Sequence, residues 1–217
     1  MKDSSNDQIT SSILLQAYAS GVFPMAYSAD ADEIFWVDPD RRGIIPLDGL
    51  HVSRSLRKAV LKGDYKICVN RAFEATVRAC AERDQTWIND EILGLYCELN
   101  RIGFAHSVEL WSDGALMGGL YGVSFGSAFF GESMFSKRTD ASKIALVYLV
   151  ARLRAGGFRL LDTQFVTDHL ARLGALEVPR AEYHKRLDWA LERQANFWKL
   201  PREACPHSVL QLITQTS

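Results

Sequence analysis

Along the first hundred residues, hydrophobic side chains recur every three or four positions, which is the period of an α-helix. This pattern predicts helices over about 11–20 and 53–62, and two more that begin after the candidate caps Asn70 and Asn89. Glycines stand where three of these helices should end, at Gly21, Gly63 and Gly103. A short strand is predicted over 65–69.

From residue 105 the period changes to alternation, which is typical of strands. Turn signals at 112–114 and 125–126 separate three predicted strands, at 105–111, 115–124 and 127–130. The pattern then predicts a long helix over 141–155, a strand over 158–162, a helical turn over 168–173 and a helix over 180–193. Three strands followed by helix, strand and helix indicate an α+β domain with a mostly antiparallel sheet.

The segment from 22 to 42 interrupts this regularity. Pro24 and the run Asp38-Pro39-Asp40 predict an irregular loop. The segment is nevertheless rich in large apolar residues, so we expect it to pack on the core or to line a pocket. We predict a small N-terminal domain over residues 1–60 and a larger domain over 61–217.

Composition restricts the function classes. The chain has 217 residues, 47% of them hydrophobic, and a net charge of -1, which is ordinary for a globular protein and argues neither for nor against a nucleic-acid partner. Neither a signal-peptide core nor an 18-residue apolar run is found, so we expect a cytoplasmic protein without a membrane span. The four cysteines lack metal-site spacing and predict reduced core thiols without a bound metal.

Positive charge is clustered at two places. The predicted helix over 53–62 carries four basic residues and no acidic one, namely Arg54, Arg57, Lys58 and Lys62. A second group surrounds the start of the long helix and consists of Lys137, Arg138 and Lys143. Either group could grip RNA phosphates without reading bases, and the second lies beside free helix N–H groups. The alternative for each is a solvated face.

Asp162 and Gln164 are the best candidates for chemistry. They lie two positions apart at the end of an apolar strand, so their side chains should share a face. The carboxylate could accept a proton and the amide could orient a reactant or donate to a developing oxyanion. The structural alternative is that Asp162 caps the next segment and Gln164 bonds the backbone. Glu132, after the third strand, is a further candidate carboxylate.

Several strings in the chain also resemble a known family. FGESMFS at 130–136, followed by Ala141-Ser142-Lys143, and LDTQ at 161–164, followed by His169-Leu170, are similar to signatures of the leucyl/phenylalanyl-tRNA–protein transferases. Further matching strings lie at 17–18, 21–24, 35–39, 51–55, 86–88, 106–111 and 173–175. One departure is Met25, because the family often has Trp at this position.

The resemblance implies a small N-terminal domain beside a domain of the N-acetyltransferase (GNAT) type. It implies transfer of Leu or Phe, and less well Met, from aminoacyl-tRNA to proteins that begin with Arg or Lys, which marks them for N-end-rule degradation. The acceptor's α-amine attacks the aminoacyl ester. Neither a metal nor an organic cofactor is implied, and we expect a monomer.

The resemblance also assigns roles to residues. It makes Asp162 and Gln164 the catalytic pair and lets Glu132 bind the aminoacyl α-amine or the acceptor. Whether Glu132, Asp38 or Asp40 reads the acceptor's Arg or Lys stays open. The aminoacyl group and the terminal adenosine would contact Met25, Trp36, Trp87, Leu120, Phe129, Ser133, Met134, Leu146 and Leu149. Each apolar residue of this kind is more often part of the core than a ligand contact.

Two other functions are alternatives to this one. An acyl-CoA-dependent N-acetyltransferase would hold pyrophosphate in a glycine-rich turn before the long helix, but residues 136–141 contain no glycine. A non-catalytic RNA-binding module would explain the basic helix, but it would have no need of Asp162 and Gln164.

Overall fold

The computed structural model describes residues 9–26, 34–83, 86 and 88–214. Its strands are β1 (Phe23–Ala26), β2 (Ile34–Val37), β3 (Arg41–Ile44), β4 (Lys66–Val69), β5 (Ala105–Ser112), β6 (Ala115–Phe125), β7 (Ala128–Ser136), β8 (Leu160–Gln164) and β9 (Leu176–Pro179). Its helices are α1 (Ser11–Ala19), α2 (Arg54–Lys62), α3 (Phe73–Ala81), α4 (Asp90–Arg101), α5 (Ala141–Gly156), α6 (Asp168–Ala171), α7 (Arg180–Leu191) and α8 (Pro206–Thr214).

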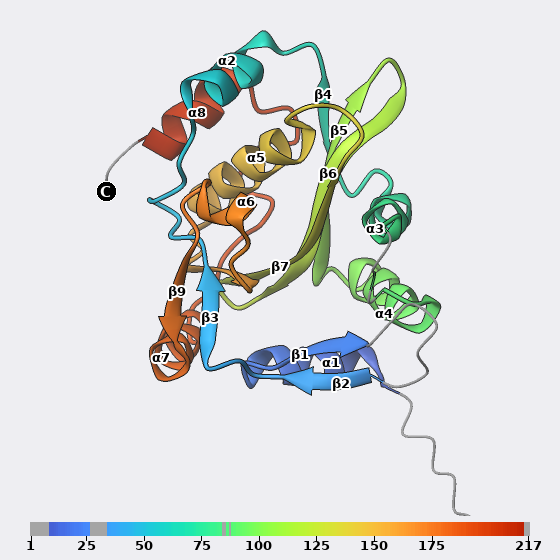
Figure 1. Cartoon of the computed structure of the whole chain (residues 1–217), viewed down its shortest axis with the longest axis vertical. Coiled ribbons are helices and arrows are strands. Elements are labelled where there is room, and N and C mark those ends of the chain that lie inside the picture. Colours follow the sequence, from blue (N-terminus) through green and yellow to red (C-terminus); the bar gives the residue numbers. More distant parts are fainter. Residues whose placement is uncertain (1–8, 27–33, 84–85, 87, 215–217) are drawn as a thin grey trace, which may run out of the picture.

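A seven-stranded sheet in the order β4-β5-β6-β7-β8-β3-β9 forms the centre of the molecule (Figure 1). Only β7 and β8 pair in parallel, and the other neighbours are antiparallel. A separate two-stranded antiparallel sheet joins β1 to β2. The prediction of an α+β fold with a mostly antiparallel sheet is therefore confirmed.

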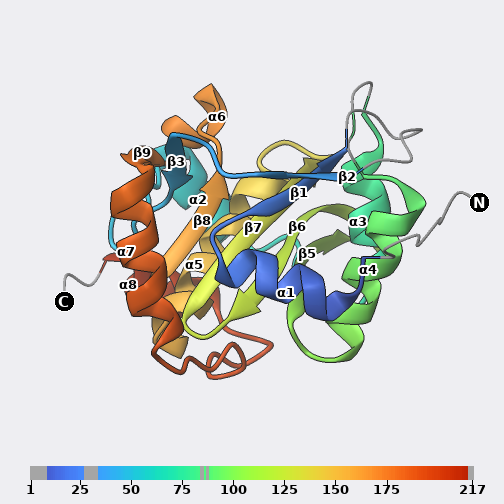
Figure 2. The same ribbon diagram turned by 90° about the horizontal axis from the view of Figure 1, so that it is seen from below.

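Hydrophobic side chains fill both sides of the large sheet. On one side, α5 packs against the sheet with α2 and α8 beyond it (Figure 1). On the other, α1, α3 and α4 lie across the strands, and α7 completes the same cluster (Figure 2). Helix α5 is buried on almost every side, which explains its nearly continuous apolar sequence. No described helix is long and apolar enough to cross a membrane.

The helix ends that the sequence predicts are largely confirmed. The Ser53 hydroxyl accepts a hydrogen bond from the Leu56 N–H at the start of α2, and Gly63 ends that helix with a φ of 62°. Asn89 caps α4 in the same way by accepting from the Ile92 N–H. These caps satisfy backbone groups that a helix leaves unpaired at its ends.

The loop prediction for 22–42 was wrong for β1, β2 and the start of β3. It is confirmed for residues 38–40, which lie outside helix and strand, and residues 27–33 lie outside the described part of the chain. Pro24 is tolerated because each strand of a two-stranded sheet has a free edge that needs no N–H donor. Strand β3 pairs with β8 and β9 and so belongs to the large sheet, although it lies within residues 1–60. A domain boundary near residue 60 stays a prediction.

Other local predictions also need correction. Asn70 does not cap α3: its φ is 54°, its side-chain oxygen accepts from the Ser107 N–H, and the Glu109 carboxylate accepts from the Ala72 N–H instead. The third strand of the meander continues to Ser136, and the short β9 and α8 were not predicted. Cys205 is exposed rather than a core thiol.

Candidate active site

A cavity of about 330 Å³ opens between α5 and the large sheet, closed on one side by β1 and α6. Its walls are mainly apolar, with a few polar groups gathered where β7 meets β8. Six of the predicted substrate contacts line it, namely Met25, Leu120, Ser133, Met134, Leu146 and Leu149, together with Glu132 and Gln164. An apolar cavity with a few convergent polar groups is the usual form of a small-ligand site.

Two of the other predicted contacts lie elsewhere, and one cannot be placed. Phe129 is fully buried and stacks on Phe197 with a ring distance of 5.8 Å, so it belongs to the core rather than to the cavity wall. Trp36 is 39% exposed on β2 and is absent from the cavity lining. Trp87 lies outside the described residues.

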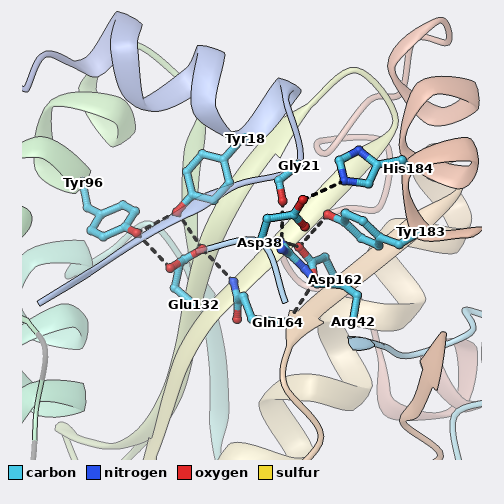
Figure 3. A network of polar contacts seen from close by, with 10 residues as sticks. All are labelled: Tyr18, Gly21, Asp38, Arg42, Tyr96, Glu132, Asp162, Gln164, Tyr183 and His184. Carbon is cyan, nitrogen blue, oxygen red and sulfur yellow. Dashed lines mark hydrogen bonds and ion pairs between the residues drawn. The ribbon is translucent and has the colours of Figure 1, made fainter. Parts of the chain in front are cut away.

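Glu132 occupies a β-bulge in β7. Tyr121 pairs with Ser133 and Gly122 pairs with Gly131, which leaves Glu132 as the extra residue. A bulge turns a side chain away from regular strand alternation and is common beside functional sites. Here it directs the Glu132 carboxylate into the polar network at the wall of the cavity (Figure 3).

Three donors surround the Glu132 carboxylate. The Tyr18 and Tyr96 hydroxyls donate to its two oxygens at 2.8 Å each, and the Gln164 Nε2 donates at 3.0 Å (Figure 3). Although the residue touches the cavity, desolvation raises the pKa of Glu132 to about 7, and the tyrosine hydrogen bonds lower it only in part. Near neutral pH the group therefore exists in both protonation states.

Gln164 has an unusual backbone conformation. Its φ is 56°, and the Phe165 N–H donates to the Thr163 carbonyl at 2.6 Å, so that a γ-turn ends β8. A non-glycine residue in this region carries conformational strain, which the surrounding structure must hold in place. The turn takes Gln164 out of regular alternation and aims its amide at Glu132.

Asp162 is fully buried and does not reach the cavity. Arg42 donates to both of its oxygens, at 3.0 and 2.6 Å, and the Tyr183 hydroxyl donates at 2.9 Å. The Gln164 N–H donates to Asp162 Oδ1 at 2.8 Å. The predicted pair is thus brought together through this backbone bond, but only Gln164 faces the cavity.

Arg42 connects four parts of the fold. Besides Asp162, it donates to the Gly21 carbonyl at 2.9 Å, and its guanidinium lies 4.5 Å from the ring centroids of both Phe23 and Tyr183. It has no exposed surface. Neither Arg42 nor Tyr183 was predicted from the sequence, since no local pattern marks either, whereas Tyr18 falls within a matched string.

The remaining carboxylate candidates are already paired. Arg180 contacts Asp40 at 2.6 Å and Asp38 at 3.4 Å, and His184 Nε2 lies 3.2 Å from Asp38. Neither aspartate lines the cavity. Within the described ranges, no group of three His, Cys, Asp or Glu side chains could hold a metal ion.

The two basic groups differ in how far they are neutralised. Arg54, Arg57 and Lys58 are exposed on α2 and have no acidic partner among the residues described, while Lys62 contacts Asp64 at 2.8 Å. In the second group, Lys137 pairs with Glu82 at 2.9 Å, Arg138 with Asp64 at 2.7 Å and Lys143 with Asp140 at 2.7 Å. Hydrogen bonds from Lys62 and Arg138 lower the pKa of Asp64 to about 2.

Fold and site together define an α+β protein with an apolar ligand cavity and a carboxylate that titrates near neutral pH, an arrangement typical of enzymes. The family model for leucyl/phenylalanyl-tRNA protein transferase matches residues 44–188, and the model for the N-terminal domain of that transferase matches residues 7–40. The chain belongs to this family.

Relatives that carry the name leucyl/phenylalanyl-tRNA–protein transferase match almost the whole chain. One from Ruegeria sp. is 58% identical over 209 residues, covering 96% of this chain and 99% of the relative. One from Paramagnetospirillum magneticum is 58% identical over 193 residues, covering 87% of this chain and 92% of the relative.

Proposed function

We propose that the protein transfers leucyl or phenylalanyl groups, and methionyl groups less readily, from aminoacyl-tRNA to the N-terminal Arg or Lys of acceptor proteins. The observation that carries this proposal is the apolar cavity that ends at Glu132 and Gln164. The mainly apolar walls suit an apolar side chain such as that of Leu, Phe or Met. The carboxylate suits the positive α-amine that every aminoacyl group carries.

Binding of that α-amine would change Glu132. Its two oxygens accept three hydrogen bonds from Tyr18, Tyr96 and Gln164, which leaves an acceptor position for an ammonium. A cation at that position favours the carboxylate and lowers the pKa of Glu132 from about 7. We therefore expect donor binding to release a proton from the fraction of molecules in which Glu132 is protonated.

The chemical step needs a modest base, because an α-amine with a pKa of about 7.7–8.0 is already partly neutral at pH 7. Conversion of an ester to an amide is downhill and needs no ATP. We assign Gln164 and Glu132 the contacts with the reacting groups, as catalytic residues. Asp162 is assigned the positioning of Gln164, since Arg42, Tyr183 and the Gln164 N–H occupy its oxygens.

Recognition of the acceptor and of tRNA uses other surfaces in this proposal. An acceptor's N-terminal Arg or Lys that used Asp38 or Asp40 would have to displace Arg180 from them. The exposed face of α2, with Arg54, Arg57 and Lys58, is assigned to tRNA phosphates because its charges are not paired with described acids. The acid-paired group around Lys137 is a weaker candidate.

The wider assignment is a cytoplasmic monomer that needs no cofactor, with a large domain of the N-acetyltransferase type. The parallel pairing of β7 with β8, connected by α5, supports this type of fold. Acyl-CoA as the donor is disfavoured, since residues 136–141, which lead into α5, contain no glycine that would let the backbone approach a pyrophosphate closely.

Transfer of radiolabelled Leu from Leu-tRNA to two peptides that differ only in an N-terminal Arg or Met tests the proposal. Label should appear on the Arg peptide alone. Gln164→Ala should reduce the rate, whereas the matched control Gln211→Ala, on α8, should not. Binding of Leu-tRNA without label on either peptide would contradict the transferase assignment.

A further inference from the structure

Arg83 follows α3 and lines the cavity beside β7. Its Nη2 donates to the Ser133 hydroxyl at 2.8 Å, and its side chain is exposed. No carboxylate among the described residues forms an ion pair with it, since the adjacent Glu82 pairs with Lys137 at 2.9 Å. Of the described lining residues, Arg83 alone carries a permanent positive charge.

The cavity is therefore lined by an acidic group, Glu132, and by a separate basic group, Arg83. Glu132 lies within the polar network, and Arg83 is held by the next residue of β7, Ser133. The end of an aminoacyl-tRNA has the matching polarity, because its α-amine is positive and the phosphate of its terminal adenosine is negative. The N-terminal Arg or Lys of an acceptor does not fit beside Arg83, because the two positive charges would repel each other.

We propose that Arg83 binds the phosphate that joins the terminal adenosine of the donor to the preceding nucleotide. The inference rests on the proposed function and adds a phosphate-binding residue to it. A guanidinium has five N–H donors in a planar fork, of which Ser133 takes one, so a bidentate contact with phosphate oxygens remains open. Such a contact would fix the position of the aminoacyl-tRNA in the site without recognising the identity of any base.

The test compares two inhibitors of transfer from full-length Phe-tRNA to an Arg-starting peptide. Both are phenylalanyl-adenosine analogues with an amide in place of the reactive ester, and only one carries a 5′-phosphate. In the wild-type protein the phosphate should lower the inhibition constant about tenfold, the size expected of one charge-assisted contact at a partly exposed site. Arg83→Gln should abolish this gain and leave inhibition by the unphosphorylated analogue unchanged.

Arg78→Gln is the matched control, because Arg78 lies on the neighbouring α3, pairs with Glu74 at 2.8 Å and does not line the cavity. It should retain the full phosphate gain. A phosphate that brings no gain in the wild-type protein, or a gain that survives in Arg83→Gln, overturns the inference. Absence of transfer from Phe-tRNA in the wild-type protein would instead overturn the proposed function itself.

Discussion

At the residue scale, the site contains two carboxylates that belong to one hydrogen-bond network but have different surroundings. Asp162 is fully buried against a guanidinium and a phenol, whereas Glu132 is held by neutral donors and touches the cavity. A charge-paired carboxylate is suited to holding backbone in place, and one with neutral partners is suited to changing its protonation near neutral pH. The proposed division of roles between Asp162 and Glu132 rests on these surroundings.

Replacement of Arg42 tests how much its buried ion pair with Asp162 stabilises the fold. Arg42→Met should lower the free energy of unfolding by about 3–5 kcal/mol, because Asp162 would remain as an unpaired buried charge. The adjacent Arg41 is a matched control: it is 56% exposed and contacts Glu177 at 3.5 Å. Arg41→Met should cost less than about 1 kcal/mol in urea unfolding. Equal losses of unfolding free energy in the two variants would contradict a stabilising contribution from the buried Arg42–Asp162 pair.

The pKa of Glu132 predicts a pH-dependent stability. It is raised to about 7 in the folded protein, whereas the ordinary value is about 4.3. The stability linked to its proton is thus fully present below about pH 4.3 and is lost as the pH rises through 7. From pH 5 to 8, the wild-type protein should lose up to ~3 kcal/mol relative to Glu132→Gln, measured by urea unfolding. If the difference in unfolding free energy between the wild-type protein and Glu132→Gln does not vary with pH, the raised pKa of Glu132 is ruled out.

Two local departures from regular strands build the site at the element scale. The bulge in β7 inserts Glu132, and the γ-turn at the end of β8 redirects Gln164. The two side chains meet because β7 and β8 are adjacent and parallel, with Phe130 opposite Asp162, so Glu132 in the middle of β7 lies level with Gln164 at the end of β8.

The glycine opposite the bulge should be intolerant of a side chain. A Cβ at Gly122 would overlap the Phe130 carbonyl oxygen and the Phe129 ring, so the backbone around Glu132 would have to shift. We expect Gly122→Ala to destabilise the protein by about 1–3 kcal/mol and to reduce transfer further than the stability loss explains.

Gly94→Ala is the control for this substitution. Gly94 is exposed on α4, and nothing lies within 4 Å of the added methyl group. Its replacement should stabilise the protein by up to about 1 kcal/mol through helix propensity. Thermal unfolding with transfer assays on both variants checks the pair. Unchanged transfer in Gly122→Ala would show that the bulge does not depend on this glycine.

At the scale of the whole molecule, the chain is nearly neutral, but its positive charges are neutralised on one surface and not on another. Acidic partners neutralise the basic group before α5, while the exposed face of α2 keeps its positive charge among the described residues. Net charge therefore says little about RNA binding in this protein. The local pairing of each cation decides which face can hold phosphates.

Salt-dependent tRNA binding distinguishes the two groups. The double change Arg57→Gln and Lys58→Gln should weaken binding and reduce the slope of log affinity against log salt by about 1–2, since each lost phosphate contact contributes about 0.7–0.9. Arg186→Gln, on α7 and paired with Glu182 at 2.9 Å, should leave the slope unchanged. A larger loss from Lys137→Gln than from the α2 changes would reverse the assignment.

The sequence by itself determined the local features of this protein. Helix ends were predictable because caps and terminal glycines act within a few residues, as at Ser53 and Gly63. Six cavity positions and the polar pair Glu132 and Gln164 were also found, since strand ends and matched strings mark them along the chain. The two-stranded sheet was missed because prolines and aspartates outweighed its apolar positions.

Only the tertiary structure decided which distant residues meet. Arg42 and Asp162 are 120 positions apart, and they pair because β3 inserts between β8 and β9. Tyr18 and Tyr96 reach Glu132 from two helices that cover the same face of the sheet. Local sequence fixes the hydrogen bonds and burial of its own segment, but the roles of Asp162 and Glu132 depend on charges and donors that packing brings from elsewhere.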